Sequence, residues 1–469
     1  MSSKIANLLR PKERSGDMTQ GNILRRIVMF SLPLLAGSVL QQLYNAVDAI
    51  VVGHYVGSAA LGAVTLAGPV VAMMVALFVG MSSGATVIIS RFFGAGDRER
   101  LEEAVHTAMM LTVIIGAALS IIGVVFTPTL LSWMSSNQAQ TAEMMSDAVT
   151  YVRIYFAGLI GLTVYNMGSG ILQAVGNSRY PLYFLLISAI LNTLGDLLLV
   201  VVFNMGVSGA AYATIGAQAL SAAFVVLVLC RSKHSYKLNI KRLRISKFVA
   251  RNIMSIGLPS AVQGAIVSAS NILVQAYLIG LNNDSIVAGN GTANSLNSFI
   301  QLPVQVMAVA VTTFVSQNLG AGNVARARRG TRDAMFIGIG VSVVLSALAL
   351  IFHEGLLTIF SPKAEVLRYG WEFMRVYTPF YFVLSCTQIL PGALRGAGDV
   401  KVATIASVGC FVVLRQVYLF IVTKTQYTVF NVALGYPATW TLCALIILIH
   451  YLRSNWTKFE REKQLTVDN

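Results

Sequence analysis

Two aspartates interrupt long apolar runs of this sequence. Asp48 lies near the end of the first run and Asp196 near the end of the fifth. If these runs cross a membrane, each carboxylate needs a functional explanation, because a charge there costs roughly 2.5 to 3.5 kcal/mol on insertion scales. Asn192 precedes Asp196 by four residues, so both lie on one face of a helix. Thr214 is as far after the next connection as Asp196 is before it, so an antiparallel hairpin places them at one level.

If the first, fifth and sixth runs are neighbours, these side chains form one layer with two carboxylates, an amide and a hydroxyl. All-oxygen ligation suits a hard cation such as Na+. The layer also suits a proton, because two carboxylates in a low-dielectric environment repel each other, and one is expected to hold a proton that a cation can displace. Alternatively, each carboxylate only bonds neighbouring backbone or hydroxyl groups and stabilises the bundle. The sequence therefore predicts a coupling-ion site for H+ or Na+ at Asp48, Asn192, Asp196 and Thr214, with the ion left open.

Further polar residues are candidates for a substrate cavity. Arg415 lies in the eleventh run without an obvious acidic partner in the second half, so it either pairs with an anionic group of the substrate or extends its charge within the bundle. Arg153 and Arg375 occupy matched places in the fourth and tenth runs, which fits a structural contact or a substrate contact. The other predicted cavity residues are Tyr44, Asn45, Asn166 and Asn271. Pro33 predicts a hinge in the first run, because proline lacks the N–H of a helical hydrogen bond.

The elements that must position these residues are membrane helices. Of the 469 residues, 56% are hydrophobic and 11% are charged, far from the roughly 25% charged residues of a soluble domain. Apolar runs of about 20 residues predict helices, and continuous runs argue against barrel strands. We read the first run as a retained helix and not as a cleaved signal peptide. The predicted spans are 23–52, 59–90, 100–126, 147–171, 180–202, 208–230, 251–280, 287–316, 327–352, 366–391, 400–423 and 431–452.

The net charge of +15 falls almost wholly on alternate loops, with Arg395 and Lys401 assigned to the loop after the tenth helix. This asymmetry predicts a multi-pass protein of the plasma membrane, such as a bacterial inner membrane, with both termini in the cytoplasm. It argues for the lipid bilayer as a partner and against nucleic acid. The predicted segments are a cytoplasmic N-terminal segment (1–22), a six-helix lobe (23–230), a basic linker (231–250), a second six-helix lobe (251–452) and a cytoplasmic tail (453–469).

The two halves look like copies of one unit. Ser31-Leu32-Pro33 is separated from Gly257-Leu258-Pro259 by the same length of chain that separates Gly94-Ala95-Gly96 from Gly320-Ala321-Gly322. Matches farther along the chain share a second, slightly shorter separation. We interpret the Gly-Ala-Gly sequences as tight turns that cap helices, because neither follows a soluble strand or continues into a phosphate-binding loop. Such repeats predict two bundles related by an axis along the membrane normal, with the substrate cavity between them.

On these features the chain resembles the multidrug and toxin extrusion family. The resemblance rests on Pro33, the Asp48 context Tyr44 to Gly53, the Gly-Ala-Gly turns, and the runs 191–196 and 206–211. It implies an all-α membrane protein with twelve transmembrane helices in two pseudo-symmetric six-helix bundles, functional as a monomer. Asp48, Asn192, Asp196 and Thr214 match the family's amino-terminal ion site. The second half has Val274 and Tyr418 where the first has Asp48 and Asp196, which implies the DNA-damage-inducible-type branch of the multidrug/oligosaccharidyl-lipid/polysaccharide exporter superfamily.

The expected function is a cation-coupled antiporter that exports organic compounds, cationic or amphipathic, by alternating access. The coupling ion is H+ or Na+, and no cofactor or further metal is expected, since no HExxH or comparable ligand spacing occurs. Motifs such as GxSxG are absent, which argues against an enzyme. The alternatives are a lipid-linked oligosaccharide flippase that uses Arg415 for an anionic headgroup, a narrow-specificity metabolite exporter of the same fold, and a channel.

Overall fold

A computed structural model describes residues 16–135 and 142–456, and every regular element in these ranges is a helix. The first half contains α2 (Ile23–Val51), η1 (Val52–Val56), α3 (Ser58–Ala95), α4 (Arg98–Ser135), α5 (Ala142–Ala157), α6 (Leu159–Ala174), α7 (Arg179–Asp196), η2 (Leu197–Val202) and α8 (Gly206–Arg231). We call these elements the N lobe. A short 3-10 helix, η3 (Ile240–Arg242), lies in the connection that follows.

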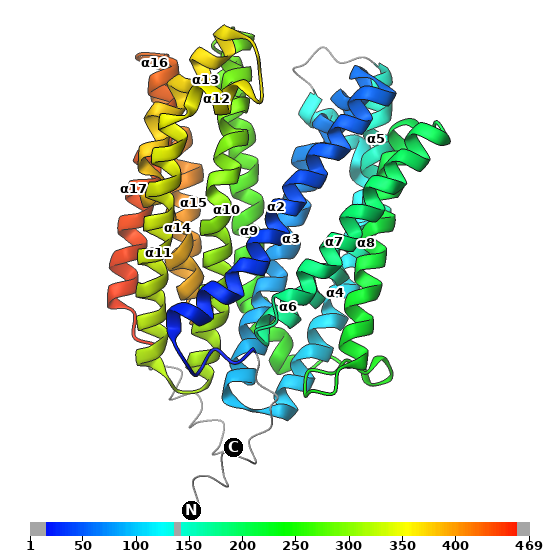
Figure 1. The fold of residues 1–469 in the computed structure, drawn as a ribbon, viewed down its shortest axis with the longest axis vertical. Coiled ribbons are helices and arrows are strands. Elements are labelled where there is room, and N and C mark those ends of the chain that lie inside the picture. The colour runs from blue at the N-terminus through cyan, green and yellow to red at the C-terminus, as the bar shows by residue number, and fades with distance from the viewer. Residues whose placement is uncertain (1–15, 136–141, 457–469) are drawn as a thin grey trace, which may run out of the picture.

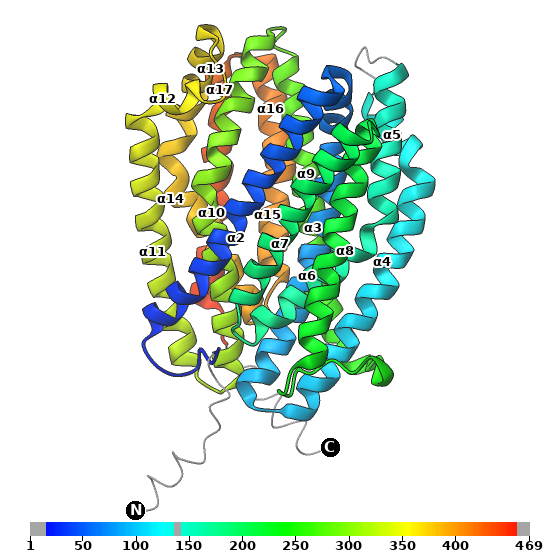
Figure 2. The same cartoon turned by 45° about the vertical axis from the view of Figure 1, so that its right-hand side comes forward.

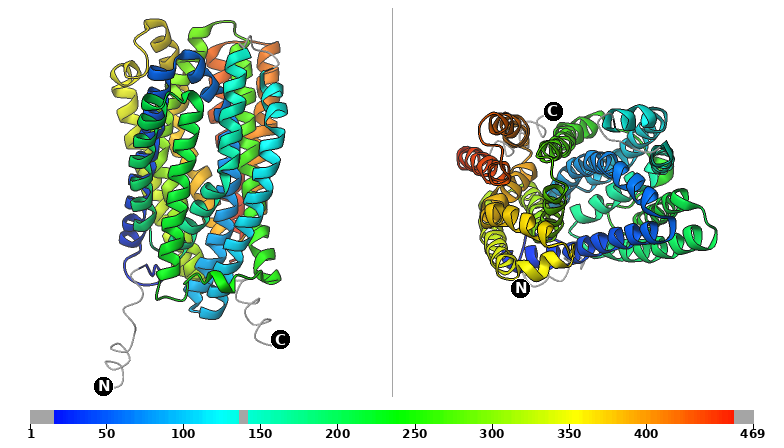
Figure 3. Two further views of the ribbon diagram at one scale, coloured as in Figure 1. Left: turned by 90° about the vertical axis from the view of Figure 1, so that its right-hand side faces the viewer. Right: turned by 90° about the horizontal axis from the view of Figure 1, so that it is seen from above.

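The second half, called the C lobe, repeats the order of the six spans, with different short elements between them. It contains α9 (Lys247–Ile279), α10 (Asp284–Gly320), α11 (Val324–Ile351), α12 (His353–Thr358), α13 (Ala364–Tyr377), η4 (Thr378–Phe380), α14 (Tyr381–Gly396), α15 (Lys401–Val408), η5 (Gly409–Leu414), α16 (Arg415–Lys424) and α17 (Val429–Arg453). Figure 1 shows the two lobes side by side, and Figure 3 shows the same two groups seen along the helix axes.

Ten helices of the described chain are long and apolar enough to cross a membrane, and the bent pair of α5 and α6 makes an eleventh span. We take α13, η4 and α14 as the twelfth span, because they are the counterpart of this bent pair in the repeat. The fourth and tenth spans were predicted as single helices, and this continuity was wrong. Both break at equivalent positions of the repeat, at Gly158 and at Phe380. The first break bends the span by 49°, and the second follows Pro379, which cannot donate a helical hydrogen bond.

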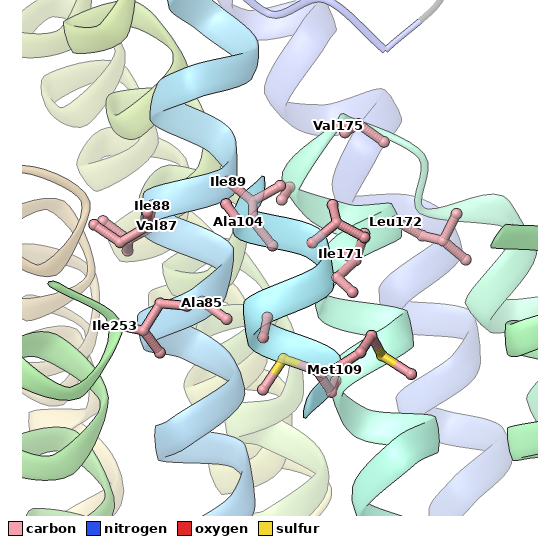
Figure 4. Packing of buried hydrophobic residues seen from close by; sticks show 14 of the residues in the cluster. Ala85, Val87, Ile88, Ile89, Ala104, Met109, Ile171, Leu172, Val175 and Ile253 are labelled. Carbon is pink, nitrogen blue, oxygen red and sulfur yellow. The ribbon is translucent and has the colours of Figure 1, made fainter. Parts of the chain in front are cut away.

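The first helix of each lobe crosses to the other lobe. At the end of the molecule where α2 begins and α17 ends, called here the basic end, Ile27 and Phe30 of α2 pack into a C-lobe cluster. At its other end, Val51 packs in the N lobe. The matched residues of α9 do the reverse, because Ile253 and Ile256 pack in the N lobe. Figure 2 shows the oblique path of α2, and Figure 4 shows Ile253 against the N-lobe cluster. This exchange of helices joins the two hydrophobic cores.

The Gly-Ala-Gly sequences contain one capping glycine each. Gly96 and Gly322 have φ angles of 72° and 80° and follow the ends of α3 and α10. Around Gly96 the Asp97 N–H donates to the Phe92 carbonyl oxygen at 3.1 Å, and around Gly322 the Asn323 N–H donates to that of Asn318 at 2.7 Å. This bond pattern satisfies the last carbonyl groups of a helix and favours glycine at the left-handed position. The predicted turns are therefore confirmed at both ends.

The other glycine of each turn brings the lobes together. A Cβ on Gly94 would lie 2.0 Å from the Gln317 carbonyl oxygen, and a Cβ on Gly320 would lie 2.1 Å from that of Arg91. The Gln317 side chain also donates across the interface to the Ala174 carbonyl oxygen at 2.8 Å and accepts from the Met18 N–H at 2.9 Å. The basic end of the molecule is thus closed by backbone-to-backbone contact between the lobes.

Candidate functional site

The acidic site lies where α7 gives way to a π-helical segment. α7 ends at Asp196, and η2 continues from Leu197 to Val202. Such segments occur often at functional sites, because they redirect side chains within a helix. Asn192 and Asp196 are buried, with 3% and 1% of their surface exposed. The Asn192 Nδ2 donates to Thr214 Oγ1 at 3.5 Å, and that hydroxyl donates to the Ala210 carbonyl oxygen. The α7–α8 hairpin therefore brings three of the four predicted residues to one level.

Asp48 approaches this layer from α2. Its carboxyl is close enough to the Asp196 carboxyl to interact with it electrostatically. Both oxygens of Asp196 and Oδ1 of Asp48 are buried without a hydrogen-bond partner among the described residues. Buried polar atoms in folded proteins nearly always have a hydrogen-bond partner. A proton or another cation bound between the two carboxyl groups would provide that partner for these oxygens. The arrangement can therefore take up one or more cations, H+ among them.

Sequence reasoning missed two tyrosines beside this layer. Tyr151 of α5 is buried and lies within electrostatic range of both Asp48 and Asp196. One turn further on, the Tyr155 hydroxyl accepts a hydrogen bond from Gln218 Nε2 at 3.4 Å. The signal was present, because Tyr151 and Tyr155 are four residues apart and share a helix face. Their direction toward α8 depends on packing and could not be taken from spacing.

The C lobe buries a cation, Arg415, whose counterpart in the repeat is Thr193 and not one of the acidic residues. Arg415, directly after η5, is buried with 4% of its surface exposed. Its NH2 donates to Thr439 Oγ1 at 3.0 Å, and the guanidinium lies 4.7 Å from the centre of the Tyr436 ring. Its Nε is buried without a partner among the described residues. Arg415 is therefore inside the C-lobe bundle and is not among the residues that line the cavity described next.

A cavity of about 290 Å³ has lining from both lobes. It lies between α2, α3, α6 and α7 of the N lobe and α10 and α14 of the C lobe. Pro33 and Asn166, two of the predicted residues, line it. Tyr44, Asn45 and Asn271 are not among the lining residues, and the latter two are exposed. Gln41 also lines the cavity and precedes Asp48 by seven residues, so the cavity and the acidic layer are ~10 Å apart along α2.

The cavity lies on the α2 side because the two crossing helices pack differently. α9 lies directly against α3, where a Cβ on Gly84 would be 2.5 Å from the Gly257 nitrogen. A Cβ on Gly80 would be 2.3 Å from the Ala261 backbone. The counterpart of Gly80 in the C-lobe repeat is Val306, which lines the cavity. A larger residue holds α2 and α10 apart, whereas glycine lets α3 and α9 meet.

The remaining predicted residues are at the surface. Arg153 and Arg375 are exposed, and Arg375 forms an exposed ion pair with Glu372 at 3.7 Å.

Pro33 lies within α2, which continues through it as one helix from Ile23 to Val51. Among the residues that the structure describes, no three His, Cys, Asp or Glu side chains gather in a group that could hold a metal ion.

A family model described as MatE matches residues 33–198 and 259–421, most of the chain and once in each lobe. The chain belongs to the MatE family. The two matches of this MATE transporter begin at Pro33 and Pro259, the prolines that open the internal repeat. The chain is therefore a multi-pass membrane transporter, and not an enzyme.

Similar proteins span nearly the whole length of this MATE transporter. The probable multidrug resistance protein YoeA of Bacillus subtilis is 26% identical over 95% of this chain and 96% of the relative. A FAD transporter of Shewanella oneidensis is 26% identical over 82% of this chain and 84% of the relative. A MOP superfamily transporter structure from Pyrococcus furiosus gives a TM-score of 0.87 at 22% identity, over 94% and 98% of the two chains. This MATE transporter thus shares the fold of twelve transmembrane helices in two bundles.

Proposed function

We propose that this transporter is a cation-coupled antiporter that exports organic, amphipathic compounds by alternating access. The observation that carries the proposal is the carboxyl pair of half-buried Asp48 and buried Asp196. Oδ1 of Asp48 and both oxygens of Asp196 are buried and have no hydrogen-bond partner among the described residues. A carboxylate pair can exchange a proton or Na+ with water, so it supplies the exchangeable charge that an ion-driven transporter needs. Asn192 and Thr214 complete the oxygen-rich layer, and H+ and Na+ are the two ions to be compared.

Coupling follows from the position of the layer on α2. The helix carries Asp48 at one end and lines the cavity from Pro33 to Gln41. An ion that binds at Asp48 favours one position of α2, and a substrate in the cavity favours another, so each promotes release of the other. Pro33 lies in the cavity-lining part of α2, where a bend changes the cavity without breaking a further backbone hydrogen bond. The asymmetry of basic loops supports the plasma membrane as location, with the basic end and both termini in the cytoplasm.

The test is transport by the purified protein in lipid vesicles under imposed pH and Na+ gradients. A fluorescent amphipathic dye serves as the substrate, because the curated relatives include multidrug export proteins. We expect a gradient of one ion to drive uptake, and Asp48→Asn to lower the initial rate by about 100-fold, at the upper end of coupling free energies of ~1–3 kcal/mol. Asp284→Asn, which changes an exposed aspartate at the start of α10, is the matched control. Wild-type exchange rates in the Asp48→Asn protein would contradict the proposal.

A further inference from the structure

The cavity between the lobes contains a positive charge to which the proposed function assigns no role. Arg395 lines it, and among the described residues it is the one charged side chain in the cavity wall. Arg395 was predicted to lie in a loop, and this was wrong, because α14 extends to Gly396, five residues beyond the predicted end. Its counterpart in the repeat, Gln173, lines the same cavity at the end of α6. The two lobes thus present an amide and a guanidinium from matched helix ends.

Among the described residues, no hydrogen bond or ion pair explains why an arginine is present at position 395. Within 16–135 and 142–456, no hydrogen bond or ion pair joins its guanidinium to another group. Asp399, the nearest carboxylate along the chain, instead lies 2.7 Å from His450 Nε2. The last carbonyl groups of α14 are also satisfied, because the N–H groups of Ala397, Gly398 and Asp399 donate to Ala393, Arg395 and Leu394. A capping role is therefore already filled by the backbone.

The rest of the wall combines amide groups with apolar surface. Gln41, Asn166, Gln173 and Gln305 lie around the cavity, and Val306, Val309, Leu182 and Tyr165 provide its apolar part. An unpaired guanidinium inside a membrane protein is costly unless a negative charge accompanies it. Arginine binds carboxylates and phosphates through two parallel hydrogen bonds, and side-chain amides add further donors. No carboxylate of the described chain lies in the wall to compete with such a ligand.

We propose that the cavity binds an organic anion, with the Arg395 guanidinium holding its carboxylate or phosphate group and the apolar wall holding its body. This inference rests on the proposed export function only for the statement that the cavity is the substrate site. It narrows the amphipathic substrate to one that carries an anionic group. The same chemistry is found in water-soluble compounds and in anionic lipid headgroups, so the experiment separates these two sources.

The test uses the full chain in nanodiscs of phosphatidylcholine and two pairs of aromatic probes. Each pair differs only in an anionic group: riboflavin 5′-phosphate against riboflavin, and 2-naphthoate against 2-naphthamide. Isothermal titration calorimetry measures their affinities. We expect the anionic member of at least one pair to bind about tenfold more tightly, the preference typical of a charge-assisted hydrogen bond. Arg395→Gln should remove this preference, and Arg395→Lys should keep part of it, because lysine retains the charge without the two-pronged geometry.

Lys401→Gln is the matched control, because Lys401 is an exposed basic residue at the start of α15 and lies outside the cavity wall. Addition of phosphatidylglycerol to the nanodiscs identifies the source of the anion. If this lipid weakens binding of the anionic probe to the wild type, its headgroup enters the Arg395 site. If it has no effect, the site takes water-soluble anions. Either result supports an anion site when Arg395→Gln removes the preference.

The assignment is overturned if neither anionic probe binds more tightly than its uncharged partner, or if Arg395→Gln preserves the preference. Size-exclusion profiles and thermal unfolding of each variant show whether it is folded. The proposed function fails separately, because it depends on ion-driven exchange and on Asp48. Ion-driven exchange with no anion preference would reject this inference alone. An Arg395-dependent anion preference without ion-driven exchange would reject the antiport mechanism alone.

Discussion

The N lobe and the C lobe place different chemistry at equivalent positions of the repeat. Thr214 and Gln218 of α8 correspond to Tyr436 and Trp440 of α17, and Tyr155 corresponds to Tyr377. In the N lobe, Gln218 donates a hydrogen bond to Tyr155. In the C lobe, the rings of Tyr377 and Trp440 pack with centres 6.4 Å apart. The same place is therefore a polar pocket in one lobe and an aromatic cluster in the other.

The charges of the two lobes differ in kind as well as in sign. The N lobe contains half-buried Asp48 and buried Asp196, and carboxyl groups can gain and lose a proton or a metal cation. The C lobe buries Arg415, which stays charged because guanidinium cannot be deprotonated in proteins. An exchangeable charge suits ion coupling, and a permanent one suits a fixed contact. We therefore expect that after duplication one lobe does the ion chemistry, while the other provides a rigid frame and the proposed anion contact of Arg395.

The largest difference between the lobes should appear when the buried charge of each is removed in turn. Asp196→Asn removes one of the two carboxyls, so ion-driven export should fall by about 10- to 100-fold, within the usual range of coupling free energies. Arg415→Met removes the C-lobe charge but leaves the carboxyl pair, so export per folded molecule should stay within about twofold of the wild type, well below a 1.4 kcal/mol effect. Both rates are measured in vesicles under the ion gradient that drives the wild type. An equal loss in the two variants would mean that coupling is shared between lobes.

Much of this arrangement could be predicted from the sequence, and the exceptions have physical causes. Helix spacing and hairpin length predicted that Asn192, Asp196 and Thr214 lie at one level. Their role as an ion site stays a prediction. The position of Arg395 could not be predicted from hydropathy, because the end of α14 is set by Gly398, with a φ of 81°. Equally, the cavity depends on the contrast between Gly80 and Val306, whose meaning appears only when the helix contacts are known.

The close contact between α3 and α10 that joins the lobes can be tested at the basic end. Gly94→Ala places a Cβ against the Gln317 carbonyl oxygen, so it should disfavour contact between the lobes there by about 1–3 kcal/mol, the usual penalty of overpacking. We expect the distance between spin labels at Glu99 and Arg329 to shift toward longer values. The measurement is electron paramagnetic resonance on a background without the four native cysteines. Gly340→Ala is the control, since nothing lies within 4 Å of a Cβ there. Unchanged distances would show that this contact does not hold the lobes together.

The last prediction concerns stability and not transport, and it tests the fixed contact of Arg415 in the C lobe. Thr439 is buried, and its hydroxyl accepts from Arg415 while donating to the Gly435 carbonyl oxygen at 2.8 Å. Thr439→Val keeps the shape of the side chain but leaves a buried guanidinium donor unsatisfied, so the protein should lose ~1–3 kcal/mol of stability. Thr441→Val is the control two residues on, because that exposed residue's hydroxyl only donates to the Pro437 carbonyl oxygen. Thermal unfolding of the purified variants measures the difference. If Thr439→Val lowers ion-driven export without lowering stability, Arg415 moves during transport and the C lobe is not a rigid frame.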